Sequence, residues 1–101
     1  MAVWVYLFDE FRPVEVDDAV VLEMAGRNPA ALFDVIRHVV EESVGGIGSV
    51  RLFDIYSDPQ GAGLLVEYLV ETRIGEISVK LIRSPAPAET LAKYYANERN
   101  R

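Results

Sequence analysis

The segment AVWVYLFDEF, residues 2–11, constrains the fold more than any other part of this chain. In an extended strand, successive side chains point to opposite faces, so the segment places aliphatic side chains on one face and aromatic rings on the other. The two sets are Val3, Val5 and Leu7, and Trp4, Tyr6 and Phe8. A strand that is apolar on both faces belongs in a sheet that is covered on both sides.

The composition indicates one folded domain over residues 1–101. Hydrophobic residues make up 50% of the chain and charged residues 26%, which is typical of a globular protein with a single core. The absence of cysteine excludes disulfides, cysteine-based zinc sites, iron–sulfur clusters and thiol nucleophiles. Few side-chain amides, no cysteine and only two methionines favour a thermophilic source.

The remaining segments predict an α+β fold of the order β-β-α-β-β-β-α. NPAALFDVIRHVVEESVGG is the clearest helix, because Asn28 can cap it, Pro29 suits its first turn and Gly45 can end it. The expected strands cover residues 2–8, 14–24, 49–57, 63–72 and 76–83, and a second helix follows in SPAPAETLAKYYANERNR. We expect a five-stranded mixed sheet with two helices, which suits a β-grasp-like core with an added C-terminal helix.

The segment 14–24, VEVDDAVVLEM, has two interpretations. Its β-branched residues favour a strand. The alternative is a short helix, capped by Asp17 and stopped by Gly26.

The segment RIGE predicts a tight hairpin between the last two strands. With Ile74 and Gly75 as its two-residue loop, Val70 lies opposite Val79. This register places apolar cross-strand pairs on one face of the sheet.

Two helices are too few to cover both faces of such a sheet. A helix is about 10 Å wide and strands lie about 4.8 Å apart, so each helix covers roughly two strands. Left open, the rings of Trp4, Tyr6 and Phe8 would match the largest apolar patches of ordinary monomers, about 300–600 Å². The C-terminal helix, a second copy of the chain or a different protein could cover them. We favour a second copy, with the C-terminal helix at the edge of the contact, and predict an interface at these residues. Tyr94 is a further interface candidate, and the alternative is that Tyr95 is core and Tyr94 half exposed.

The sequence indicates no catalytic residue, cofactor or metal. His38 is the only histidine; Asp34 and Glu42 flank it at helical spacing, but a solvated helix face explains this group better than a metal site with so few ligands. No serine lies in a nucleophile-elbow motif. The glycine-rich segment GGIG, residues 45–48, follows a helix, whereas a phosphate-binding loop leads into one.

Charge and hydropathy limit the partners and the location. The net charge of −6 opposes binding to a phosphate backbone, so no nucleic acid partner is expected. No apolar run is long enough to span a membrane and no signal peptide is visible, so we expect no membrane partner and a cytoplasmic protein.

The two-sided AVWVYLFDEF, the amide-poor composition and the tail AETLAKYYANER together resemble the arcadins, small accessory proteins of the archaeal actin-like protein crenactin. The resemblance spans the whole chain in size and general character, and no motif transfers a functional residue. It implies a cytoplasmic, non-enzymatic protein that associates with an archaeal actin-type cytoskeleton.

The sequence thus predicts a non-catalytic protein–protein interaction module that self-associates. One alternative is a small ligand- or metal-binding enzyme subunit whose site forms between protomers. Another is a subunit of a larger complex whose partner covers the face of Trp4.

Overall fold

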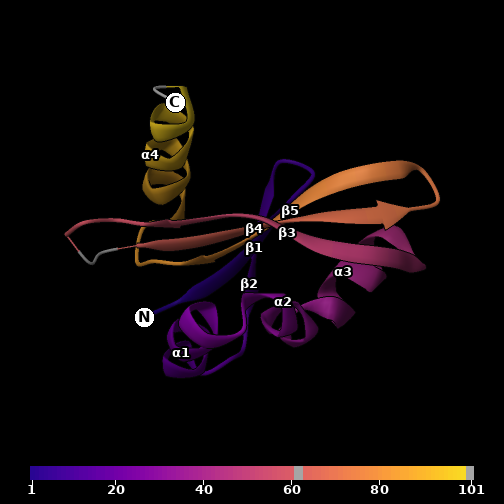
Figure 1. Cartoon of the computed structure of the whole chain (residues 1–101), viewed down its shortest axis with the longest axis horizontal. Helices are drawn as coiled ribbons and strands as arrows, with labels where there is room; N and C mark the ends of the chain where they lie inside the picture. Colours follow the sequence, from indigo (N-terminus) through magenta and orange to yellow (C-terminus); the bar gives the residue numbers. More distant parts are fainter. Residues whose placement is uncertain (61–62, 100–101) are drawn as a thin grey trace.

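The computed structural model describes residues 1–60 and 63–99, which form one α+β domain with a five-stranded antiparallel sheet of order β2-β1-β5-β4-β3 (Figure 1). The strands are β1 (Val3–Leu7), β2 (Glu10–Val14), β3 (Ile47–Ser57), β4 (Leu64–Thr72) and β5 (Gly75–Arg83). The described residues also form four α-helices and one 3₁₀ turn: α1 (Asp18–Arg27), α2 (Pro29–Leu32), η1 (Phe33–Val35), α3 (Arg37–Val44) and α4 (Pro87–Arg99). The expected α+β class and the number of strands are confirmed, but the second strand is Glu10–Val14 and not 14–24, and the described residues form four helices where two were expected. The mixed sheet is wrong, since every strand pair is antiparallel, and the β-grasp-like core is not confirmed.

The N-terminal hairpin is tighter than expected. β1 ends at Leu7, and Phe8 and Asp9 form a two-residue turn with φ angles of 52° and 60°. A type I′ hairpin turn needs positive φ at both central residues, which is unfavourable for a bulky side chain such as Phe8. Phe8 therefore does not continue the aromatic face of the strand, and it is 53% exposed.

The predicted second strand at 14–24 is wrong. The alternative, a helix capped by Asp17, is correct, but α1 continues through Gly26 and ends at Arg27. Asp17 caps α1 by accepting a hydrogen bond from the Ala19 amide at 2.9 Å. Val21 and Ala25, four residues apart, are buried, which is the spacing of one helix face. The β-branched residues of this segment favour a strand, but the segment forms a helix because one face of that helix is buried on the sheet.

The predicted helix 28–45 begins and ends as expected but is interrupted. The Asn28 side chain accepts from the Ala31 amide at 3.2 Å, and Gly45, with a φ of 79°, follows the last residue of α3. Around Ile36, whose φ is −112°, the chain leaves α-helical geometry, which divides the segment into α2, η1 and α3. Apolar residues on both sides of the break pack into the same core, and the buried ones are Leu32, Phe33, Ile36 and Val40.

The β4–β5 hairpin is confirmed, but its register differs by two residues. The loop is Arg73–Ile74, so Val70 pairs with Ile77 and not with Val79. Because side chains alternate with a period of two, this shift leaves every side chain on its expected face.

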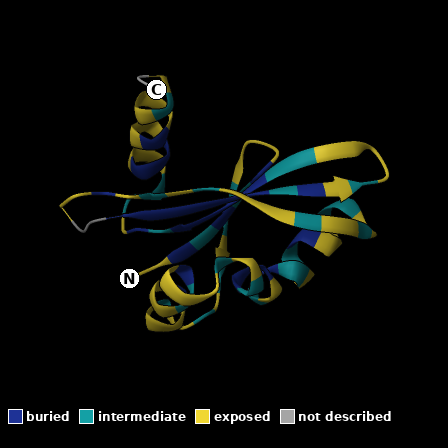
Figure 2. Ribbon diagram, viewed as in Figure 1, coloured by how far each residue is buried: buried dark blue, intermediate teal, exposed yellow. Residues whose placement is uncertain are grey.

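The two faces of the sheet are covered by different helices (Figures 1 and 2). α1, α2, η1 and α3 cover one face and form the larger core with it, whereas α4 packs on the other. The Tyr68 hydroxyl on β4 donates to the Pro29 carbonyl of α2 at 2.7 Å and so connects the sheet to the helices that cover it. Burial raises the pKa of Tyr68. The helices α1 to α3 thus leave α4 to cover the aromatic face of β1.

Candidate functional site

The aromatic side chains predicted to form an interface lie mainly under α4. Trp4 and Tyr6 are half-buried and pack against a small core on the α4 face of the sheet. Tyr94 belongs to that core and is 1% exposed, while its neighbour Tyr95 is 37% exposed. The expectation of a core Tyr95 is therefore wrong. The chain's own C-terminal helix therefore covers much of the surface at which a second copy was expected.

A charged pair lies on the sheet beneath α4. Glu67 on β4 and Lys80 on β5 are directly paired and only 7% and 6% exposed. Their Oε2 and Nζ atoms are 3.9 Å apart, and the Ser78 hydroxyl donates to Glu67 Oε2 at 2.8 Å. Lys80 Nζ donates to Ser78 Oγ at 2.9 Å. Buried charges are tolerated only when they are paired and hydrogen-bonded, and these groups meet that condition.

Tyr94 connects α4 to this pair. Its hydroxyl lies 2.5 Å from Glu67 Oε1 and 3.3 Å from Glu98 Oε1. Burial, followed by the hydrogen bond to Glu67, raises the pKa of Tyr94. The single hydroxyl proton goes to Glu67, the closer acceptor, so Tyr94 holds the middle of α4 on the sheet.

Lys80 also links α4 to the N-terminal hairpin. Its ammonium lies 5.7 Å from the ring centre of Tyr6 and 5.6 Å from that of Tyr95, within the range of cation–π attraction. The Tyr6 hydroxyl donates to Asp9 at 3.0 Å, and this hydrogen bond is the main cause that raises the pKa of Tyr6.

Polar contacts also hold the N-terminal half of α4. The Thr90 hydroxyl donates to Ser84 Oγ at 2.8 Å, and Lys93 Nζ donates to Asp58 Oδ2 at 2.9 Å. The contact with Lys93 lowers the pKa of Asp58. Gly63 allows this close packing, because a Cβ there would lie 2.5 Å from Thr90 Oγ1.

This polar cluster was missed at the sequence level. Glu67 and Lys80 alternate with apolar residues along their strands, and such a pattern does not show that α4 lies across the face that carries them. The usable signal was the pairing of opposite charges on neighbouring strands of one hairpin. Beside the cluster, Tyr95, Glu98 and Arg99 line a shallow hollow of about 470 Å³.

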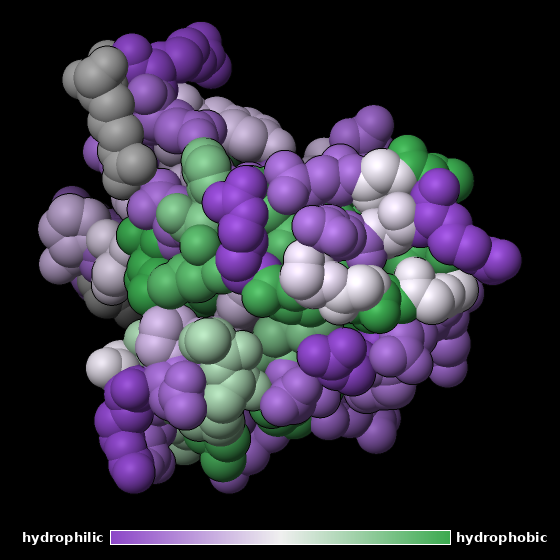
Figure 3. Space-filling view, turned by 45° about the vertical axis from the view of Figure 1, so that its right-hand side comes forward, coloured by the Kyte–Doolittle hydropathy of each residue, from purple (hydrophilic) through white to green (hydrophobic). Residues whose placement is uncertain are grey.

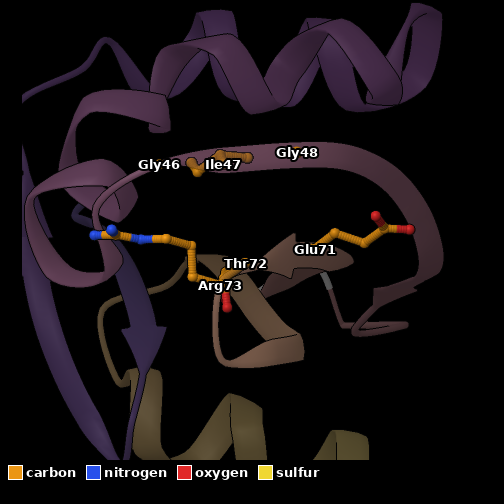
Figure 4. Close-up of a pocket in the computed structure, with 6 residues that line it drawn as sticks. All are labelled: Gly46, Ile47, Gly48, Glu71, Thr72 and Arg73. Carbon is orange, nitrogen blue, oxygen red and sulfur yellow. The ribbon is translucent and has the colours of Figure 1, made fainter.

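A second hollow, of about 300 Å³, lies where β3 begins and β4 ends (Figure 4). Its lining residues are Gly46, Ile47, Gly48, Glu71, Thr72 and Arg73. Figure 4 shows the side chains of Glu71 and Arg73 pointing away from each other. The glycine segment here follows α3, as expected, and the charged groups do not converge on one point.

The residues considered for metal binding are separated by the helix break. His38 is exposed on α3, while Asp34 lies in η1 and accepts from Arg37 Nε at 3.3 Å. Among residues 1–60 and 63–99, no group of three or more His, Asp or Glu side chains could hold a metal ion. None of the helices in those ranges is long and apolar enough to cross a bilayer.

Three large apolar side chains are exposed on β3, at one edge of the sheet. Leu52, Phe53 and Ile55, here called the β3 patch, are 36%, 49% and 38% exposed. Leu52 pairs with Tyr68, on the face covered by α1 to α3, so the patch continues the larger core beyond its helices. Figure 3 shows hydrophobic residues gathered in a band between hydrophilic margins on one side of the molecule.

Comparison with protein-family models, curated proteins and solved structures found no match to this chain.

Proposed function

We propose that this chain is a non-catalytic protein–protein interaction module that self-associates in the cytoplasm. The observation that supports it is the β3 patch, three large apolar side chains on the outermost strand of the sheet. A long apolar edge strand tends to acquire a partner, because it is otherwise prone to uncontrolled association. The proposal thus moves the interface from the aromatic face of β1, which α4 covers, to β3.

The area of the patch supports a modest affinity. Its three side chains offer on the order of 250 Å² of apolar surface per copy, and burying that area contributes about 6 kcal/mol. Two copies contribute about 12 kcal/mol, against an association cost of about 4–15 kcal/mol. Polar contacts around the patch therefore decide how tightly two copies bind.

Light scattering over a concentration series tests self-association directly. We expect the average mass to rise toward a multiple of 11.3 kDa as the protein concentration increases. The replacement Phe53→Ser removes the most exposed side chain of the patch and should shift the rise to higher concentrations. A mass of one chain at all concentrations would refute self-association.

The resemblance to the arcadins suggests a second binding partner besides another copy of the chain. We propose an archaeal actin-like filament protein, and co-sedimentation with such filaments is the test. A chain that stays in the supernatant in every nucleotide state of the filament would count against this partner, while leaving self-association open.

A ligand-binding subunit is the second candidate function. The hollow at Tyr95, Glu98 and Arg99, next to the buried Glu67–Lys80 pair, favours it. If a small anion or cation binds there, its addition should raise the melting temperature in proportion to the logarithm of its concentration. Replacing Arg99 by alanine should abolish the shift caused by an anion, and a shift that persists would exclude this hollow.

A further inference from the structure

A short connection joins α4 to the sheet. Only residues 84–86, here called the hinge, lie between the end of β5 and the start of α4. Ser84 is fixed to the sheet side, because its amide donates to the Ala2 carbonyl at 3.0 Å and the residue is only 2% exposed. The chain therefore turns toward α4 at Pro85 and Ala86.

The sequence around the hinge, SPAP, favours an extended chain. Ser84 and Ala86 each precede a proline, and such residues prefer an extended to a helical backbone conformation. Each proline also fixes its own φ angle, which leaves few ways for so short a segment to reverse direction. Short hinge segments of limited freedom promote the exchange of the element that follows them between two copies of a chain.

α4 can leave the sheet without disturbing the larger core. It lies on the face opposite to α1, α2 and α3 (Figure 1). Its buried residues are Thr90, Leu91 and Tyr94. Elements with few buried apolar contacts open locally at a lower free energy than the whole domain unfolds. α4 is therefore suited to open as one unit.

Opening of α4 uncovers a surface that needs a new cover. The small core beneath the helix includes apolar side chains from β1, β4 and β5, namely Trp4, Tyr6, Leu65 and Ile82. Returning such side chains to water is unfavourable, so an open chain gains free energy by taking up another occupant.

The α4 of a second copy is the occupant that fits this surface. Glu67 and Asp58 are acceptors that are only 7% and 8% exposed, so the occupant has to bring a donor to each of them. α4 carries these donors in Tyr94 and Lys93. Both contacts join the helix to residues before the hinge, so a helix from a second copy can make them in the same way.

We infer that two copies of this chain exchange their α4 helices, so that each helix lies on the sheet of the other copy. The inference rests on the self-association proposed above, but the β3 patch plays no part in it. Exchange is reciprocal and therefore gives a closed pair. A helix tethered to its own sheet has an effective concentration of about 1 mM, so exchanged pairs form mainly as the protein concentration approaches that value.

A disulfide between α4 and the sheet side distinguishes an exchanged pair from any other dimer. A Cβ at Gly63 would lie 3.3 Å from Thr90 Cβ, close to the separation of about 3.5–4.5 Å in disulfides. The chain lacks cysteine, so the double variant Gly63→Cys/Thr90→Cys carries no other thiol. Within one copy the bond leaves a monomer on a non-reducing denaturing gel, whereas in an exchanged pair it links two copies.

Oxidation of the double variant at two concentrations gives the readout. The linked fraction should be about tenfold or more larger after equilibration at about 1 mM than at about 10 µM. Thr90→Cys alone is the matched control, because its side chain lies against Gly63 in either arrangement, and it should give no linked dimer. A three-residue insertion after Ala86 relaxes the hinge and should remove most of the linked dimer from the double variant.

A second pair of positions covers a double variant that circular dichroism shows to be unfolded. Lys93 Nζ and Asp58 Oδ2 lie 2.9 Å apart, so Asp58→Cys/Lys93→Cys with a short bis-maleimide reports the same contact. The linked fraction of this pair should show the same dependence on concentration.

The outcomes separate the exchange from the proposed function. If the wild-type chain self-associates in light scattering but the folded double variant forms only the bond within one copy, the exchange is wrong and self-association stands. A linked fraction that the hinge insertion leaves unchanged would overturn the role given to the hinge. A wild-type chain that is monomeric throughout, with no linked dimer in the variant, refutes the exchange together with self-association.

Discussion

The Tyr94 hydroxyl provides the sharpest test of how α4 is held on the sheet. The change Tyr94→Phe removes a donor 2.5 Å from Glu67 Oε1 and keeps the ring in place. Glu67 is only 7% exposed, so water does not replace the lost donor while α4 stays docked. Hydrogen bonds to charged groups contribute about 1.5–3 kcal/mol. We therefore expect the free energy of unfolding to fall by about 2 kcal/mol, which in a domain of this size lowers the melting temperature by roughly 8–16 °C.

Urea unfolding, followed by the fluorescence of Trp4 and by far-ultraviolet circular dichroism, measures this loss. Trp4 is the only tryptophan and packs against the core that contains Tyr94, so its emission reports on α4 docking. The matched control is Tyr95→Phe, at a ring that is 37% exposed, and it should change stability by less than about 0.5 kcal/mol.

A double-mutant cycle with Glu67→Met isolates the pairwise energy. In the Glu67→Met background the Tyr94 hydroxyl keeps only the longer contact with Glu98, so Tyr94→Phe should cost at least about 1 kcal/mol less than in the wild-type chain. The reasoning is refuted if the two substitutions are additive, or if Tyr94→Phe alone is as stable as the wild-type protein.

Three further predictions concern the backbone at Gly63 and Phe8 and the ion pair between Asp58 and Lys93 of α4. Gly63→Ala should destabilise the protein by about 1–3 kcal/mol in urea unfolding, because its Cβ would lie 2.5 Å from Thr90 Oγ1; an unchanged midpoint would show that Thr90 can move freely. Phe8→Asn should stabilise the chain by about 0.5–1 kcal/mol in the same assay, because asparagine tolerates the observed φ of 52° better than phenylalanine; destabilisation would show that the exposed ring makes a needed contact. The pKa of Asp58 is lowered by Lys93, so its contribution to stability is present above the unfolded pKa of about 3.9 and is lost as pH falls through the lower folded value. Asp58→Asn should therefore be less stable than the wild-type chain at pH 6. Below pH 4 it should lose less further stability than the wild-type chain does. If acid destabilises both proteins equally, the Asp58–Lys93 contact is not the source of this pH dependence.

The predictions from sequence succeeded where local rules and tertiary packing agree. Asn28, Pro29 and Gly45 mark helix boundaries through their own backbone preferences, and the structure uses each in that way. The three last strands are confirmed because each is an apolar run between turn residues.

The errors arose where packing decides between near-equal local states. The segment 14–24 has strand-forming residues, yet it forms α1 because Val21 and Ala25 bury one helix face on the sheet. In α4, Tyr94 and Tyr95 are equally apolar neighbours, and only the place where the helix crosses the sheet determines which of them is buried.

The candidate site could be foreseen only in part from sequence. A two-sided N-terminal strand required cover on both faces, and the structure provides it through α4. The sequence could not show that Glu67 and Lys80 would be sealed beneath that helix, because burial depends on contacts between residues far apart in the chain.

The sequence by itself determined the α+β class, four of the five strands and the need to cover two apolar faces, because alternation, capping and turn preferences act over a few residues. Tertiary structure alone decided the antiparallel strand order, the buried role of Tyr94 and the exposure of Leu52, Phe53 and Ile55 on the outer edge. The physical reason is that burial belongs to the packed assembly of elements. A residue's own chemistry sets what burial or exposure costs, whereas the fold sets which of the two occurs.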